Sequence, residues 1–241
     1  MLRLLIVLAI GLAALPAGAA LAPVEEFIVD EMSASGVPGL AHAVVVDGEV
    51  TTIGAYGVTK EGGENVAAET PFQIGSISKS FTALAVMQLV EAGEVGLDTE
   101  ISEYLDDFLG RLAGAITVRQ LLSHTSGFST LQGNTSHTDA TGGNDELALQ
   151  VDGLAVAGPA HQPGERWEYS NANYQILGRL VEAVSGQDYQ TYVTDNVLEP
   201  VGMEHSFVAD GEVHEEMATG HRPWFATKRD LSENTSRRGT A

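Results

Sequence analysis

The chain has 241 residues, enough for one large domain or two modest ones, and its 44% hydrophobic content predicts a folded protein with a substantial core. Its 12 basic and 33 acidic residues give a formal net charge of −21, which argues against binding to nucleic acid or to an anionic membrane surface, because phosphate groups would be repelled. The absence of cysteine excludes disulfides, thiolate catalysis, cysteine-ligated zinc and a lipid-modified cysteine.

The first residues have the pattern of a secretory signal peptide. Arg3 is followed by the uninterrupted apolar run Leu4–Leu15 and then by a proline and small residues. We expect residues 1–19 to be a signal peptide that is cleaved after Ala19 or after Ala22. Residues 20–241 are then expected to form the mature domain. The alternative is an uncleaved anchor, since the apolar stretch is nearly long enough to span a bilayer. Both interpretations predict export to the periplasm or the exterior.

Two apolar runs near the N-terminus predict a hairpin. A short amphipathic helix is expected over residues 23–33, because its apolar residues recur on one helical stripe. Residues 39–46 and 50–56 are then expected to be antiparallel strands, since Asp47-Gly48 between them is a strong hairpin turn pair. No obvious later strand completes a sheet with this hairpin.

The rest of the chain is predicted to be mostly helical. The helix that begins at Ser76 is apolar nearly all round between Phe81 and Val90, which predicts a buried helix that ends at Gly93. The remaining expectations are helices at residues 118–122, 174–184 and 189–198, a long loop at residues 129–146, and no regular structure from residue 221 onward.

A serine and a lysine lie three positions apart at the start of this buried helix. Ser76 and Lys79 would face the same side of the helix, one turn from each other. Serine needs an adjacent base to act as a nucleophile, and a lysine that loses its hydration is favoured in the neutral form that can accept a proton. With 15 Ser and 3 Lys in the chain, a chance match is uncommon. The structural alternative is a helix-capping serine beside a lysine that reaches solvent.

A second candidate group precedes the helix expected at residues 174–184. In Tyr169-Ser170-Asn171, a phenol near an ammonium would have its pKa lowered and could relay protons, while the Asn171 amide could hold a substrate carbonyl. The structural alternative is that Asn171 caps the helix and that Tyr169 belongs to the core or its rim.

Together these motifs resemble the beta-lactamase-related serine hydrolases, which comprise class C beta-lactamases, D-alanyl-D-alanine carboxypeptidases and esterases of the same fold. The resemblance covers about residues 25–220. The segments that carry it, in the family's order, are residues 72–83, 118–127, 163–178 and 198–203. It implies an α/β (α+β) beta-lactamase/transpeptidase-like fold, in which an antiparallel sheet is flanked by helices and joined to a helical subdomain.

The resemblance also implies a role for each matching residue. Ser76 would be the acylated nucleophile, and its backbone N–H would form half of the oxyanion hole. Lys79 would be the general base, and Tyr169 would share the proton relay and protonate the leaving group. Asn171 would hold the acyl side chain and position Lys79. Tyr-Ser-Asn, in place of the Ser-Asp-Asn of class A enzymes, favours the class C and esterase branch. His124 lies in a matching segment, but we assign it only a turn-stabilising role.

One motif of the family has no match. The family carries His-x-Gly or Lys-Thr-Gly on a strand at the edge of the site, after Tyr-x-Asn, and it supplies the second oxyanion N–H. Residues 221–223 read His-Arg-Pro and lack the glycine, while Lys60-Glu61-Gly62 precedes the nucleophile and is treated as a coincidence. We therefore expect a C-terminally truncated chain that lacks the last sheet strands and is not a competent enzyme by itself.

The sequence thus predicts a secreted serine hydrolase that forms an acyl-enzyme on Ser76 and acts on a beta-lactam, a D-Ala peptide or an ester. The alternative is a non-catalytic, penicillin-binding-like ligand-binding protein or an inactive fragment. No cofactor or metal is expected, because the 7 His lack ligand spacing and no Gly-rich phosphate loop is present. The expected partner is a small-molecule or peptidoglycan-derived substrate, with no nucleic acid, and with a membrane only if the N-terminal segment is uncleaved.

Overall fold

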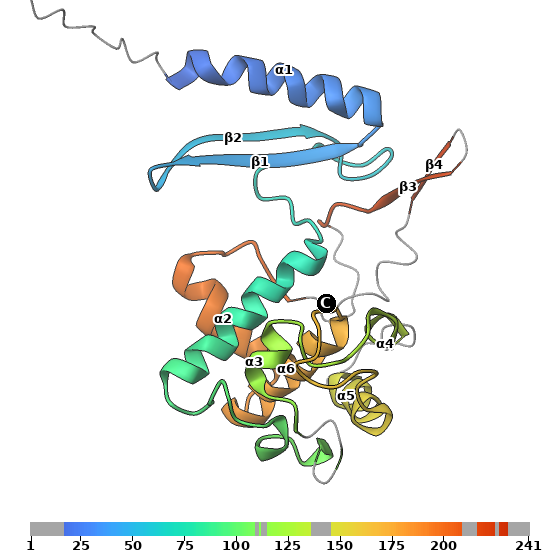
Figure 1. The fold of residues 1–241 in the computed structure, drawn as a ribbon. Helices are drawn as coiled ribbons and strands as arrows, with labels where there is room; N and C mark the ends of the chain where they lie inside the picture. Colours follow the sequence, from blue (N-terminus) through green and yellow to red (C-terminus); the bar gives the residue numbers. More distant parts are fainter. Residues whose placement is uncertain are drawn as a thin grey trace, which may run out of the picture. The chain divides into compact units, whose positions relative to one another are not determined.

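The computed structural model divides the chain into two compact units, residues 1–68 and residues 69–241 (Figure 1). The residues whose structure is described are 17–108, 111, 115–135, 146–208, 216–224 and 227–230. The greater part of the expected signal peptide lies outside these ranges, so the boundaries 1–19 and 20–241 stay predictions. No helix among the described residues is long and apolar enough to cross a membrane.

The N-terminal unit contains one helix and one hairpin (Figure 1). Helix α1 spans Ala17–Ser35, six residues longer at its start than expected, because the alanine-rich stretch before Pro23 favours helix. Strands β1 (Gly39–Val46) and β2 (Glu49–Gly57) pair antiparallel as predicted. Asp47 and Gly48 both have positive φ, 51° and 83°, the backbone that a tight two-residue hairpin turn requires. Within the described residues, β1 and β2 form a two-stranded sheet with no third strand.

The second unit begins with the helix predicted to be buried. A single turn of 3₁₀ helix at Gly75–Ile77 leads into α2 (Ser78–Glu91), and Gly93 follows with a left-handed φ of 77°. The expectation of burial all round is wrong. One face of α2 contacts α6 and α7, whereas Leu84 and Met87 on the other face are 47% and 42% exposed.

Helix α6 lies at the centre of the second unit and contacts all the other longer helices there (Figure 1). It spans Asn171–Ser185 and ends at Gly186, whose φ of 71° stops the helix. The helices around it are α2, α3 (Val118–Leu122), α4 (Thr130–Thr135), α5 (Glu146–Ala157) and α7 (Tyr189–Val193). The side chains of Ile176, Leu177 and Leu180 are fully buried, so α6 supplies the middle of the core. A π-helical turn, Thr194–Leu198, and a 3₁₀ turn, Glu199–Val201, follow α7.

Two segments that were expected to be irregular contain regular structure. Helix α4 and the first residue of α5 lie within residues 129–146, although residues 136–145 are outside the described ranges. Residues 221–224 and 227–230 form the antiparallel pair β3 (His221–Trp224) and β4 (Thr227–Asp230). An apolar periodicity is not needed for such a pair, because its hydrogen bonds join backbone groups.

Candidate active site

Ser76 and Lys79 lie one helical turn apart where the 3₁₀ turn meets α2. Ser76 is exposed, whereas Lys79 is only 6% exposed. The Lys79 Nζ donates a hydrogen bond to Ser76 Oγ over 3.4 Å, so the spacing read from the sequence does bring the two groups together. A serine hydroxyl within hydrogen-bond reach of an amine is an arrangement in which the amine can activate the serine.

Tyr169 joins this pair from the segment immediately before α6. Its hydroxyl lies 2.7 Å from Ser76 Oγ, and its ring centroid lies 5.4 Å from Lys79 Nζ. Burial raises the pKa of Tyr169, but hydrogen bonding to Ser76 and Lys79 and the positive charge of Lys79 outweigh it, so the net shift is downward. Three groups capable of proton transfer therefore meet at one point.

Asn171, the first residue of α6, does not hydrogen-bond to Lys79. Its Nδ2 donates to Asn134 Oδ1 over 3.4 Å, and its buried Oδ1 has no hydrogen-bond partner. Since a lysine ammonium can only donate, an Asn171–Lys79 hydrogen bond would have to end on this Oδ1. The Asn171 amide oxygen is thus an unused hydrogen-bond acceptor next to Tyr169.

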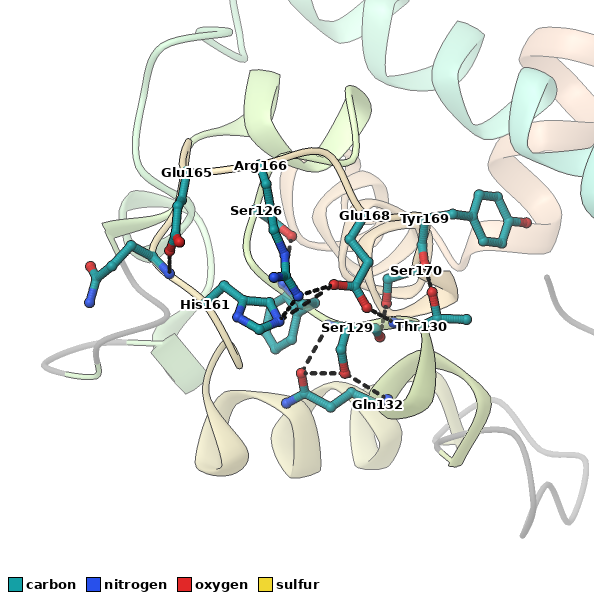
Figure 2. Close-up of polar contacts among 12 residues, drawn as sticks. Ser126, Ser129, Thr130, Gln132, His161, Glu165, Arg166, Glu168, Tyr169 and Ser170 are labelled. Carbon is teal, nitrogen blue, oxygen red and sulfur yellow. Dashed lines mark hydrogen bonds and ion pairs between the residues drawn. The ribbon is translucent and has the colours of Figure 1, made fainter.

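The backbone on both sides of Tyr169 is anchored to residues 124–130. Thr130 Oγ1 donates to the Tyr169 carbonyl oxygen over 2.5 Å, and Ser170 Oγ donates to the Ser129 carbonyl oxygen over 2.8 Å. The Glu168 N–H donates to the His124 carbonyl oxygen over 2.9 Å. These bonds fix the backbone from which the Tyr169 phenol projects, and Figure 2 shows its ring pointing away from this cluster of polar contacts.

The family model described as Beta-lactamase matches residues 24–237. This chain belongs to the beta-lactamase family. The family expected from the motifs is thereby confirmed.

Among curated relatives, the chain is 39% identical over 180 residues to penicillin-binding protein 4 of Amycolatopsis lactamdurans, covering 73% of this chain and 46% of that one. It is 31% identical over 188 residues to the protein flp of Staphylococcus aureus, covering 76% and 37%. The chain therefore spans half or less of the length of these relatives.

Solved structures of the beta-lactamase family confirm the expected fold. The octameric penicillin-binding protein homologue from Pyrococcus abyssi matches with a TM-score of 0.72 and 29% identity over 90% of this chain and 52% of that one. The D-alanine carboxypeptidase AmpC from Burkholderia cenocepacia matches with a TM-score of 0.71 and 29% identity over 86% and 55%. A class C beta-lactamase at 23% identity and a TM-score of 0.74 shows the fold alone.

An ion cluster in this beta-lactamase-family site was not anticipated from the sequence. Glu168 Oε2 accepts from Arg166 Nη2 over 2.8 Å and lies 3.4 Å from His161 Nε2, and Arg166 also contacts that ring nitrogen (Figure 2). Glu168 Oε1 accepts from the Thr130 N–H over 2.9 Å at the start of α4. Hydrogen bonds from Thr130 and Arg166 hold the pKa of Glu168 below its usual value. The cluster thus ties α4 to the residue that precedes Tyr169.

The capping signal for α4 was present in the sequence. Ser129 and Gln132 form a reciprocal capping box: the Ser129 N–H donates to Gln132 Oε1 over 3.0 Å, and the Gln132 N–H donates to Ser129 Oγ over 3.3 Å. A Ser-x-x-Gln search would have found this helix start, and with it the neighbour of Tyr169.

Proposed function

We propose that this chain carries the nucleophile and proton-transfer groups of an exported serine hydrolase that forms an acyl-enzyme on Ser76. The observation that carries the proposal is the meeting of Ser76 Oγ with Tyr169 OH at 2.7 Å and with the buried Lys79 Nζ at 3.4 Å. Family membership supports the same chemistry, since relatives of this fold include a D-alanine carboxypeptidase and a D-amino acid amidase.

In the proposed reaction, Ser76 Oγ attacks the carbonyl carbon of the substrate. A C–O bond forms, the carbonyl oxygen becomes an oxyanion beside the Ser76 N–H, and the serine proton passes to Lys79 in its neutral amine form, either directly or through the Tyr169 hydroxyl. The C–N or C–O bond to the leaving group then breaks, and Tyr169 delivers a proton to the leaving atom. Water later hydrolyses the ester on Ser76 and regenerates the hydroxyl.

The unused acceptor of Asn171 supports a substrate with an amide N–H on its acyl side. Such a donor would satisfy Asn171 Oδ1, which is buried without a partner. The proposed substrates are a beta-lactam, a D-Ala peptide or an ester. The first two are favoured, because they commonly carry an acylamino group whose N–H can donate to Asn171 Oδ1. Export is proposed from the apolar run after Arg3 and is tested by the N-terminal mass of the secreted protein.

The test is the rate of reaction with a fluorophosphonate. This probe needs no turnover: Ser76 Oγ forms a bond to phosphorus, fluoride leaves, and the serine proton passes to Lys79 or Tyr169. Ser76→Ala is expected to abolish labelling, and Lys79→Ala to slow it by about 10²-fold or more, the usual scale for a general base. Ser80→Ala, which removes an exposed serine of the same helix, is the matched control and is expected to react at the normal rate. Undiminished labelling of Ser76→Ala would overturn the proposal and favour a ligand-binding role.

A further inference from the structure

His124 adopts a backbone conformation that a side chain rarely takes. Its φ is 57°, and among the described residues the other non-glycine residue with positive φ is Asp47, in the hairpin turn. His124 directly follows Ser123, the C-cap of α3, a place where glycine costs least. A left-handed residue with a Cβ is strained, because the Cβ lies too close to the following carbonyl oxygen. Such strain at this position indicates that the imidazole itself is needed there.

The Nδ1 atom of His124 accepts hydrogen bonds from two groups at the start of α6. It lies 3.3 Å from the Ser170 backbone N and 2.9 Å from Asn173 Nδ2. The Ser170 N–H is a fixed donor, so Nδ1 carries no proton. The fully buried Asn173 amide has a matching orientation, since its Oδ1 accepts from Ser126 Oγ over 2.5 Å and leaves Nδ2 facing the ring. Nδ1 is therefore an acceptor, and the ring proton is on Nε2.

Burial and the nearby Lys79 disfavour a charged imidazole. Its centroid lies 4.8 Å from the Tyr169 ring and 5.3 Å from the Tyr174 ring, with Trp167 edge-on at 6.2 Å. Lys79 Nζ lies 5.4 Å and 5.8 Å from the same two tyrosine rings. Burial of the ring, followed by the charge of Lys79, lowers the pKa of His124 below its usual value. Protonation would add a second cation near Lys79 and remove the acceptor that both N–H groups use.

From this geometry we infer that neutral His124 is the positioning residue for Tyr169, holding the Ser170 N–H and the Asn173 amide so that the Tyr169 hydroxyl stays within reach of Ser76 Oγ. This inference rests on the proposed function. Rotation of Tyr169 away from Ser76 would break the 2.7 Å contact, and misplacement of a reacting group by about 1 Å can cost about 10²-fold in rate. His124 acts through Tyr169 and does not touch the substrate.

Two variants separate this role from a merely structural one. His124→Asn keeps an acceptor close to the place of Nδ1, tolerates the left-handed backbone and does not titrate. His124→Gly removes the ring without backbone strain. We expect His124→Gly to slow fluorophosphonate labelling of Ser76 by about 10- to 10²-fold at pH 7.5, and His124→Asn to restore most of this loss. Asp47→Gly, the same change at the other left-handed residue, is the matched control and should leave the rate unchanged.

The pH dependence of the labelling rate distinguishes the two roles, because a purely structural role of His124 would not change it. In the wild type, His124 is held neutral, so its contribution to the rate is lost only as the pH falls through its pKa, which burial and the charge of Lys79 place below the usual value. The profile of His124→Asn should lack this component and stay higher on the acid side. An unchanged rate in His124→Gly, or identical acid limbs in the wild type and His124→Asn, would overturn the inference.

A spectroscopic measurement keeps the inference testable if His124→Gly does not fold. In the wild-type protein, ¹⁵N chemical shifts of the His124 ring at pH 7.5 should show an unprotonated Nδ1 and a protonated Nε2. A proton on Nδ1 would overturn the inference. If the wild type is not labelled at Ser76 at all, the proposed function fails, and the ring tautomer still decides whether His124 holds the start of α6 as described.

Discussion

Lys79 is predicted to lower the free energy of unfolding of the protein. Its side chain is 6% exposed, and none of the ion pairs among the described residues includes it. A buried cation without a carboxylate partner loses hydration that nothing nearby replaces in full. Lys79→Met removes the charge and keeps a flexible chain of similar length. We therefore expect the variant to lose acylation and to gain stability.

The size of the gain follows from the contacts of Lys79. Replacing a buried ion pair by well-packed apolar residues is often neutral or stabilising, by about 1–4 kcal/mol, and we expect removal of this single buried charge to fall in the same range. The variant also loses one hydrogen bond to Ser76 and two cation–π contacts, at 5.4 and 5.8 Å, which reduce this gain, so we expect a net gain of about 1–2 kcal/mol. For a chain of 241 residues this corresponds to a rise in Tm of about 2–8 °C.

Calorimetric or fluorescence melting of the wild type and Lys79→Met at pH 7.5 measures the effect. Lys60→Met is the matched control, because it removes the same unit of charge from an exposed position and should shift stability by no more than about 0.5 kcal/mol. A fall in the Tm of Lys79→Met, or an equal rise in both variants, would refute the account of Lys79 as an unpaired buried cation.

Two further predictions concern packing and net charge. A Cβ at Gly133 would lie 2.5 Å from the Asn171 backbone N and 2.9 Å from the Ala172 backbone N, so Gly133→Ala should destabilise the protein by about 1–3 kcal/mol and slow labelling of Ser76. Gly153→Ala, in a helix with nothing within 4 Å of the new Cβ, should instead stabilise by about 0.5–1 kcal/mol, and equal effects of the two changes in denaturant titration would contradict this. A net charge of −21 predicts a Tm that rises with ionic strength between low and moderate salt, and a flat or falling Tm would count against self-repulsion.

The local elements that the sequence predicted well are those with a strong local signal. Asp47-Gly48 fixed the hairpin turn, the helix at Val118–Leu122 has the expected bounds, and Gly93 and Gly186 end their helices in the left-handed conformation. Helix α5 was not predicted: the expected loop ended at residue 146, and the residues from there to 157 were left without an assigned structure. Its buried Val151 and Leu154 do carry a helical spacing, which a narrower window would have detected.

The part of the site that lies within one turn of helix was predictable from the sequence. The contacts between residues far apart in the sequence were less so. Ser76 and Lys79 are brought together by helix geometry alone, and the resemblance to the family added Tyr169. The anchoring of Tyr169 by Thr130 was not visible, because the two residues lie in different segments that meet only in the folded unit. The same reason hid the role of His124, whose partners Ser170 and Asn173 lie more than forty residues further along the chain.

The identity of the residue that becomes covalently modified tests the central claim most directly. The wild-type protein is treated with a fluorophosphonate, digested, and mapped by tandem mass spectrometry. The account predicts a single modified residue, Ser76, because no other serine among the described residues lies between a buried lysine and a tyrosine hydroxyl. Modification of a different serine, with Ser76 recovered unmodified, would contradict it.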